Sequence, residues 1–291
     1  MLPSNSKYKL YEKTVPPGKN VLIHEHMSPY QLIRLYRNGK DYWMSLNAEM
    51  QFHTKECDLS HKYMCLSPLR MLGHKPNKIL VIGGGDGLPT KLLLKHALSF
   101  TQIELDPDLV ALTKTHPVMR KISNDSFNHP KVDLRVGDGV QFLIDTPDKY
   151  DIIIDDCDFG VSNQPGLNAP GKDDQKKYDD YKDAVIEKLT PGGIAVFMEN
   201  VIWPWRNIGR KGTGFIQQWC IDNARQWSQG SQQERHQCLK KSIKDDIMDW
   251  KEYTPHVKSE MVILPVIGPE HYIYLSNRPL KNVQQSRKEN K

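Results

Sequence analysis

Short apolar runs alternate with helical segments through the middle of the chain. The first run, at 79–82, has four consecutive apolar residues, which is typical of a strand buried on both faces of a parallel sheet. A helical pattern follows at 88–96, and further strands are expected at 101–105, 132–136, 150–154 and 189–197. This order of strands and helices predicts an α/β fold with a Rossmann-like sheet.

The segments before residue 68 have a different pattern. Short alternating runs at 20–25, 31–36 and 42–47 are separated by turn-forming residues, including the Asn-Gly pair at 38–39. Alternation with a period of two favours half-buried strands, and Asn-Gly is a strong hairpin signal. We therefore expect a small antiparallel β region ahead of the main sheet.

The last third of the chain has weaker signals. A helical pattern covers 215–227, and apolar runs at 257–264 and 271–275 predict an antiparallel pair that turns around Gly268 and Pro269. Residues from 281 on are polar and charged, as in disordered tails. The expected organisation is a β-strand domain at 1–68, a Rossmann-like domain at 69–280 and a polar tail at 281–291.

Glycines follow the first strand directly, in the motif Gly83-Gly-Gly-Asp-Gly87. Glycine permits a sharp turn and a close approach of the backbone to a ligand, and the helix that starts next presents N–H groups and the positive end of its dipole. The second strand reaches Glu104 about 20 residues later, where an acid can bind both ribose hydroxyls. This spacing is typical of a nucleotide-binding unit.

Each of the first four parallel strands carries carboxylates at its C-terminal end. Taken alone, such an acid is as often a helix N-cap or a turn former as a ligand. Because ligands of open α/β sheets bind at the carboxyl ends of the strands, the four positions are expected to converge on one crevice. The residues are Asp86, Glu104, Asp138, and the group Asp155, Asp156 and Asp158.

The composition constrains partners and location. With 38% hydrophobic and 26% charged residues and a formal net charge of +5 spread along the chain, we expect a globular protein with no nucleic-acid partner. Five cysteines without paired spacing favour a reducing cytoplasm over a disulfide framework. No apolar run approaches about 18 residues, so neither a signal peptide nor a membrane span is expected. Cys57 and His61 lack a second ligand pair, so no metal site is expected.

The chain resembles the spermidine and spermine synthases, aminopropyltransferases of the methyltransferase-like superfamily, from about residue 30 to residue 274. The resemblance implies a class I methyltransferase-type sheet preceded by an N-terminal antiparallel β domain that often forms homodimers or homotetramers. It is carried by Ser28-Pro-Tyr-Gln31, Leu46-Asn-Ala-Glu-Met-Gln-Phe52, Gly83-Gly-Gly-Asp-Gly87, Glu104-Leu-Asp106, Gly137-Asp-Gly139, Tyr150-Asp-Ile-Ile-Ile154 and Leu189-Thr-Pro-Gly-Gly193.

The resemblance implies a reaction between two small molecules. The donor would be decarboxylated S-adenosylmethionine and the acceptor a polyamine such as putrescine, giving a spermidine-type product and methylthioadenosine. Asp86 would hold the amine of the aminopropyl group, and Asp158, with Asp155 or Asp156 as the first acid, would take a proton from the attacking amine. The excess of acids at the crevice also favours a donor that has an ammonium and no carboxylate.

The resemblance also implies the nucleoside contacts. Gln51 would reach the nucleoside from above the glycine turn, Glu104 would bind the ribose, and Asp138 would accept from the adenine amino group. The nucleoside half of the site is therefore expected to be complete. The turns around the nucleoside would include Gly83, Gly85 and Gly139.

The amine half of the site departs from the family. An ungapped comparison puts Ser60 on the tyrosine that packs on the amine, and Leu264-Pro-Val-Ile267 replaces a Pro-Thr-Tyr-Pro motif that holds a second tyrosine. The end of the fourth strand is also shifted and lacks a proline. His61 keeps a polar group near the amine, and Trp203 and Trp205 either line this pocket or belong to the core. An acceptor other than putrescine therefore stays open.

Two other functions stay open on the sequence. One is a methyltransferase that uses intact S-adenosylmethionine on a small amine, because a glycine motif with an acid also occurs in that class. The other is a nucleoside-binding protein without catalysis, because both tyrosines are missing. The polar stretch at 161–171 is either a lid over the substrate or a plain surface connection.

Overall fold

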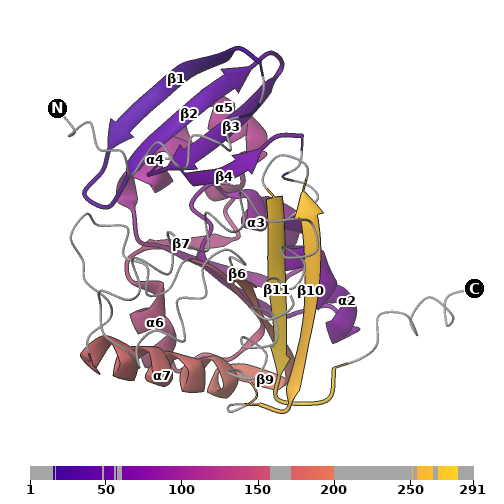
Figure 1. Ribbon diagram of the computed structural model, residues 1–291. Coiled ribbons are helices and arrows are strands. Elements are labelled where there is room, and N and C mark those ends of the chain that lie inside the picture. Colours follow the sequence, from indigo (N-terminus) through magenta and orange to yellow (C-terminus); the bar gives the residue numbers. More distant parts are fainter. Residues whose placement is uncertain are drawn as a thin grey trace, which may run out of the picture.

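The computed structural model describes residues 16, 18–47, 49–55, 57, 61–157, 172–199, 251, 254–264 and 268–280, which form two sheets and a set of helices (Figure 1). The strands are β1 (Asn20–Met27), β2 (Leu32–Asn38), β3 (Asp41–Leu46), β4 (Glu49–His53), β5 (Lys78–Gly83), β6 (Ser99–Glu104), β7 (Val132–Val136), β8 (Tyr150–Asp156), β9 (Leu189–Glu199), β10 (His256–Leu264) and β11 (Gly268–Ser276). The helices are the π-helical turn η2 (Lys62–Leu66), α2 (Ser67–Leu72), α3 (Leu88–Leu93), α4 (Pro107–Thr115), α5 (Pro117–Ile122), the 3-10 turn η3 (Ser126–Asn128), α6 (Gly139–Asp145) and α7 (Lys172–Glu187).

Seven strands form the main sheet, in the order β10-β11-β9-β8-β5-β6-β7. β5 pairs in parallel with both β6 and β8, and β8 pairs in parallel with β9. The last two strands join beside β9 as an antiparallel pair. From β5 the chain continues to β6 and β7 on one side of β5, and it then crosses to β8 on the other side. Open α/β sheets bind their ligands at such a switch point.

Alternate side chains of the central strands supply two hydrophobic layers. Ile79 and Val81 of β5 pack with residues of η2, α2 and α3, whereas Leu80 and Ile82 pack with residues of α6 and α7. All four side chains are buried. This burial on both faces explains why the strand is a continuous apolar run in the sequence and does not alternate.

The strands β1 to β4 form a separate antiparallel sheet, which lies over α4 and α5 (Figure 1). The hairpin between β2 and β3 turns at Gly39, whose φ of 62° suits glycine. The inner face of this sheet shares one hydrophobic cluster with α3, α4 and α5. The cluster includes Ile33, Leu35, Met44, Phe52, Leu88, Leu109, Leu112 and Met119, so the N-terminal sheet packs on helices that follow the strands of the main sheet.

The structure confirms the predicted α/β fold, with its Rossmann-like sheet and N-terminal antiparallel strands. One detail was wrong: Gly268 and Pro269 pair with Leu264 and Ile263 inside the β10–β11 ladder, so they do not form its turn. The predicted helix at 215–227 lies outside the described residues, and the domain boundaries at 68 and 280 stay predictions. In the described part of the chain, no helix has the length and apolar character needed to cross a membrane.

Candidate active site

The glycine turn after β5 is packed so tightly that it excludes side chains. Gly83 and Gly84 have positive φ values of 77° and 67°, which residues with a Cβ rarely adopt. A Cβ on Gly83 would lie 2.4 Å from the carbonyl oxygen of Asp156, and a Cβ on Gly85 would lie 2.7 Å from Oε2 of Glu104. The C-terminal ends of β5, β6 and β8 therefore meet at this turn.

Asp86 is a carboxylate buried inside the turn, with an exposed fraction of 7%. Its Oδ1 accepts a hydrogen bond of 2.9 Å from the N–H of Leu88, and its Oδ2 lies 4.0 Å from Nε2 of His61. Burial raises the pKa of Asp86, and the nearby His61 and the N–H of Leu88 counter that rise in part. A positively charged ligand group would stabilise this buried charge further.

His61 comes directly before η2, and it is buried with its side chain near Asp86 of the glycine turn. Its Nδ1 is 2.8 Å from the carbonyl oxygen of Cys57, and because a carbonyl only accepts, we assign a proton to Nδ1. Nε2 then faces Asp86. Cys57 thus contributes a backbone oxygen, and within the described residues no group of three or more His, Cys, Asp or Glu could hold a metal ion.

The two acids around the end of β6 have different partners. Glu104 is buried beside the turn, and its Oε1 accepts a hydrogen bond of 3.0 Å from the N–H of Asp106. Asp106 bonds to the loop between β1 and β2, through Ser28 Oγ at 2.7 Å and Gln31 Nε2 at 2.9 Å, and it also caps α4. Glu104 is therefore the acid whose second oxygen borders the site, while Asp106 joins the two sheets.

Neighbouring carboxylates at the end of β8 differ in their surroundings. Asp155 is buried and accepts hydrogen bonds from the Tyr181 hydroxyl at 2.6 Å and from the Cys157 N–H at 3.1 Å. Asp156 is partly exposed, and its Oδ2 would lie 3.3 Å from a Cβ on Gly84. Asp155 thus fixes the end of the strand, and Asp156 borders the turn. Outside the described residues lie Asp158, Trp203, Trp205 and the stretch 161–171.

The remaining predicted nucleoside contacts lie on β4 and at the start of α6. Asp138 caps α6, with its Oδ1 accepting from the N–H of Val140 at 3.0 Å. A Cβ on Gly139 would meet Cγ2 of Ile82 at 2.5 Å, so this glycine allows α6 to pack against β5. Gln51 is half-buried in β4. Asp138 and Gly139 have clear structural roles at α6, and the nucleoside contacts of all three residues stay predictions.

Three polar side chains that the sequence analysis did not single out hold the carbonyl groups of the turn. Gln102 is the first, on β6. Thr113 Oγ1 donates to the Gly85 oxygen at 2.6 Å across 28 residues, and Ser126 Oγ donates to the Gly87 oxygen at 3.0 Å across 39 residues. Contacts over such separations leave no periodic signal in the sequence. Gln102 gave no clear signal either, because Thr101 and Glu104 on the same strand are also polar.

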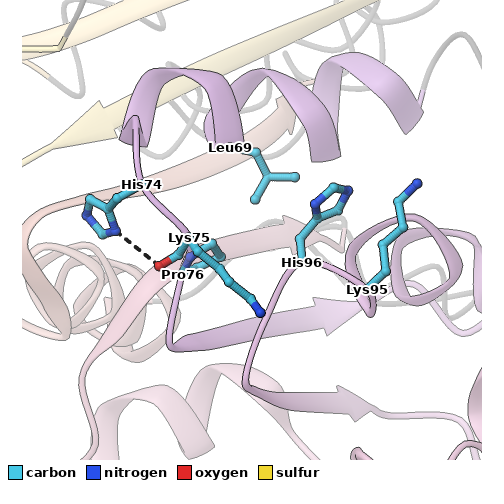
Figure 2. Close-up of a pocket in the computed structure, with 6 residues that line it drawn as sticks. All are labelled: Leu69, His74, Lys75, Pro76, Lys95 and His96. Atoms are coloured by element: carbon cyan, nitrogen blue, oxygen red, sulfur yellow. Dashed lines mark hydrogen bonds between the residues drawn. The ribbon is translucent and has the colours of Figure 1, made fainter.

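A surface pocket of about 370 Å³ lies at the opposite end of the strands (Figure 2). Its basic side chains follow helix C-termini, where positive charge offsets the negative end of the helix dipole: His74 and Lys75 come after α2, and Lys95 and His96 come after α3. Such a lining repels a cation. This pocket therefore does not suit the ligand that the carboxylates around the glycine turn favour.

Glu104 provides a test of the electrostatics of this site. Burial raises its pKa from 4.5 to about 7, and the nearby charges of Asp106 and Asp86 add to the rise. At a pH between these two pKa values, Glu104 keeps its proton in the folded protein and has lost it in the unfolded chain. The free energy of unfolding of the ligand-free protein should therefore fall as pH rises from about 4.5 to about 7, by about 3 kcal/mol from this group.

Urea unfolding of the wild type and of Glu104→Gln at pH 5 and pH 8 checks this expectation. Gln keeps the oxygen that accepts from the Asp106 N–H and does not titrate, so the variant supplies the baseline for all other groups. We expect the stability of the wild type relative to the variant to be about 3 kcal/mol lower at pH 8 than at pH 5. A difference that does not change with pH would show that Glu104 titrates normally.

A mostly parallel sheet, with a glycine turn at its switch point and buried acids beside that turn, places the protein in the Rossmann-like class of folds. Comparison with known families narrows the class. The family model described as the spermine/spermidine synthase domain matches residues 53–227, which is more than half of the chain. The chain belongs to this family.

Curated relatives carry the name polyamine aminopropyltransferase. Polyamine aminopropyltransferase 2 of Aquifex aeolicus is 33% identical over 153 residues, which cover 52% of this chain and 31% of that protein. The polyamine aminopropyltransferase of Oceanobacillus iheyensis is 30% identical over 168 residues, which cover 56% of this chain and 30% of that protein. The chain thus spans about a third of the length of these relatives.

Solved structures share the fold at low sequence identity. A spermidine synthase in complex with the transition state analogue AdoDATO aligns with a TM-score of 0.63 and 16% identity, covering 93% of this chain and 78% of that one. The spermidine synthase of Thermotoga maritima aligns with a TM-score of 0.62 and 17% identity, with the same coverage of 93% and 78%. These matches support the two-sheet architecture.

Proposed function

We propose that the protein is an aminopropyltransferase that moves the aminopropyl group of decarboxylated S-adenosylmethionine onto a di- or polyamine. The observation that carries this proposal is the buried carboxylate of Asp86 inside the glycine turn, where the tail of a bound nucleoside would end. Burying this carboxylate is unfavourable, and a cationic ligand group at hydrogen-bond distance would offset that cost more closely than His61, whose Nε2 lies 4.0 Å away. Membership of the family supports the same reaction.

The acids around Asp86 favour the decarboxylated donor over intact S-adenosylmethionine. The pKa of the buried Cys65 thiol is raised by burial and then by the negative charges of Asp156 and Asp86, so both carboxylates act on the same small region. Glu104 is a third acid beside the turn. The carboxylate of an intact donor would meet like charges here, whereas the single ammonium of the decarboxylated donor would meet opposite ones.

The reaction that we propose is one displacement at carbon. An amine has a pKa of about 10 and is protonated at neutral pH, so a base must remove a proton before attack. Asp158 takes this proton, the free amine forms a C–N bond to the propyl carbon next to the sulfonium, and the C–S bond breaks. The electron pair of that bond stays on sulfur, which leaves as the neutral thioether of methylthioadenosine. Asp86 and Glu104 hold the donor in line during this step.

The acceptor binds on the side of the turn where His61 lies. Its Nε2 faces Asp86 and offers a polar contact next to the reacting group. The family tyrosines are absent from this chain, because Ser60 and the run at 264–267 replace them. We therefore propose that the pocket accepts an amine whose shape differs from that of putrescine, for example a longer polyamine.

A donor-by-acceptor assay tests the proposed function. The purified chain is incubated with either sulfonium donor and with putrescine, cadaverine, spermidine or spermine, and the nucleoside product is separated by chromatography. We expect methylthioadenosine from the decarboxylated donor with at least one amine. S-adenosylhomocysteine from intact S-adenosylmethionine would instead indicate a methyltransferase, and binding of methylthioadenosine without turnover would indicate a nucleoside-binding protein.

We further propose a cytoplasmic homodimer or homotetramer. β1 is an edge strand of the N-terminal sheet, and its Leu22 and Met27 have exposed fractions of 46% and 51%. An exposed apolar edge is suited to pairing with a second copy of the chain. Light scattering of the purified protein measures the number of subunits.

A further inference from the structure

Gln102 is a fully buried amide in the middle of the main sheet. It lies on β6, between β5 and β7, and its exposed fraction is 0%. Its neighbour on β6, Ile103, and its pairing partner on β5, Val81, are apolar and buried. Burying an amide is unfavourable unless its groups are hydrogen-bonded, whereas a methionine of similar volume would fill the space without that cost. The hydrogen bonds of Gln102 should therefore explain its presence.

Both ends of the Gln102 amide have partners around the glycine turn. Nε2 donates to the carbonyl oxygen of Gly83 at 2.6 Å and to that of Gly84 at 2.8 Å. Oε1 accepts from the hydroxyl of Thr90, on α3. Because the two carbonyl oxygens can only accept, the NH2 group is the end that faces the turn, and Oε1 is left to accept from Thr90. We call this pair the Gln102–Thr90 clamp.

The clamp fixes the direction of the N–H groups of the turn. In a trans peptide the C=O and the N–H point in opposite directions, and the described residues contain no cis peptide. Holding the oxygens of Gly83 and Gly84 therefore directs the N–H groups of Gly84 and Gly85 away from Gln102. Among the described residues, neither of these two N–H groups donates to a protein acceptor, so both are available to a ligand.

This restraint matters because glycines do not hold a turn by themselves. Gly83 and Gly84 adopt positive φ, but glycine populates either sign of φ almost equally well, so these peptides can rotate unless their oxygens are held. The Gly87 N–H holds the Gly84 oxygen at 2.9 Å, and Gln102 adds a second donor there and a donor at the Gly83 oxygen. A rotated peptide would present a carbonyl oxygen, and no N–H donor, toward the oxygens of a ribose. A side-chain donor placed on both carbonyls removes that alternative.

We propose that Gln102, supported by the hydrogen bond from Thr90, is a positioning residue that holds the glycine turn in the peptide orientation needed to bind the nucleoside donor. The inference rests on the proposed function for the identity of that donor. The clamp belongs to the nucleoside half of the site, and it does not contact the amine. A loss of the clamp should therefore weaken nucleoside binding and leave amine binding unchanged.

The test uses Gln102→Met and Thr90→Val, each of which keeps the volume of the side chain and removes its hydrogen bonds. Binding of methylthioadenosine is measured by calorimetry, and the KM values for donor and amine are measured separately. We expect Gln102→Met to raise the Kd for methylthioadenosine and the KM for the donor about tenfold, with the KM for the amine unchanged. Thr90→Val should act in the same direction, and the double variant should be no worse than Gln102→Met, because both changes break one clamp.

Thr101→Val is the matched control, since Thr101 is the neighbouring polar residue on β6 and, in the described part of the chain, makes no side-chain hydrogen bond to the turn. Its affinity for methylthioadenosine should equal that of the wild type. The inference fails if Gln102→Met lowers Tm and leaves the Kd for methylthioadenosine unchanged. If Gln102→Met does not fold, the Kd of Thr90→Val for methylthioadenosine tests the inference in its place. Calorimetry needs no turnover, so it tests the clamp even if the wild type is inactive with the decarboxylated donor. Such inactivity would count only against the proposed function.

Discussion

Asp86→Asn is expected to lower kcat/KM for decarboxylated S-adenosylmethionine about 100-fold. The buried carboxylate would contribute a charge-assisted hydrogen bond to the ammonium of the donor, worth about 2–3 kcal/mol, and Asn would leave that ammonium without its counter-charge. The fold should survive the change, because the Oδ1 of Asn can still accept from the N–H of Leu88. Steady-state kinetics with the donor varied at saturating amine measure the effect.

Methylthioadenosine provides the control for Asp86→Asn. This product has the adenosine of the donor and no ammonium, so its Kd should change less than about threefold in the variant. Equal losses for donor and product would contradict the assignment, because they would indicate that Asp86 supports the turn as a whole and does not bind the tail. A normal kcat/KM in the variant would leave the preference for the decarboxylated donor without its physical basis.

Asp158→Asn is expected to lower kcat by about 100-fold to 10,000-fold, with binding of methylthioadenosine retained. An amide cannot take a proton from the attacking ammonium, so turnover would depend on the small fraction of amine that is already neutral. That fraction grows with pH up to the pKa of the amine, about 10. The kcat of the variant should therefore keep rising through pH 9, where the wild type has levelled off, as pH–rate profiles of both proteins would show.

Asp155→Asn and Asp156→Asn serve as comparisons for Asp158→Asn. Asp155 accepts hydrogen bonds from Tyr181 and Cys157, so its replacement should lower stability and activity without the continued rise of kcat with pH. Asp156 borders the turn, so its replacement should act on the KM for the donor. Normal turnover in Asp158→Asn, together with a pH-dependent loss in one of the other two, would move the base to that residue.

Much of the main sheet could be predicted because its signals are local. The run at 79–82 is apolar at every position since β5 is covered on both faces, and the glycines at its end are required by the approach of Asp156 and Glu104. The N-terminal hairpins were predicted for the same reason, from alternation and the Asn-Gly pair. The turn at Gly268 was misplaced, because glycine followed by proline also occurs at the start of a strand.

The roles of individual acids could not be predicted, because they depend on contacts between distant segments. The family resemblance selected Glu104, but the spacing alone does not separate it from Asp106. The structural difference lies in Ser28 and Gln31, which bind Asp106 from across more than 70 residues. Gln102 was overlooked for the same reason, since its partners at Gly83 and Gly84 lie 19 and 18 residues away, on another strand. Periodicity describes which face a side chain occupies, and it does not describe what the side chain meets there.

The order of strands in the main sheet has a consequence for synthesis on the ribosome. β9 pairs with β11, which follows it in the chain by about 70 residues, so the nascent β9 has one neighbour, β8, for several seconds at roughly 5–20 residues per second. During that interval an apolar edge, with Ile194, Val196 and Phe197, stays open to other nascent chains. Slower elongation after β9 would lengthen this exposure, and a chaperone that covers strand edges would be most useful at that stage.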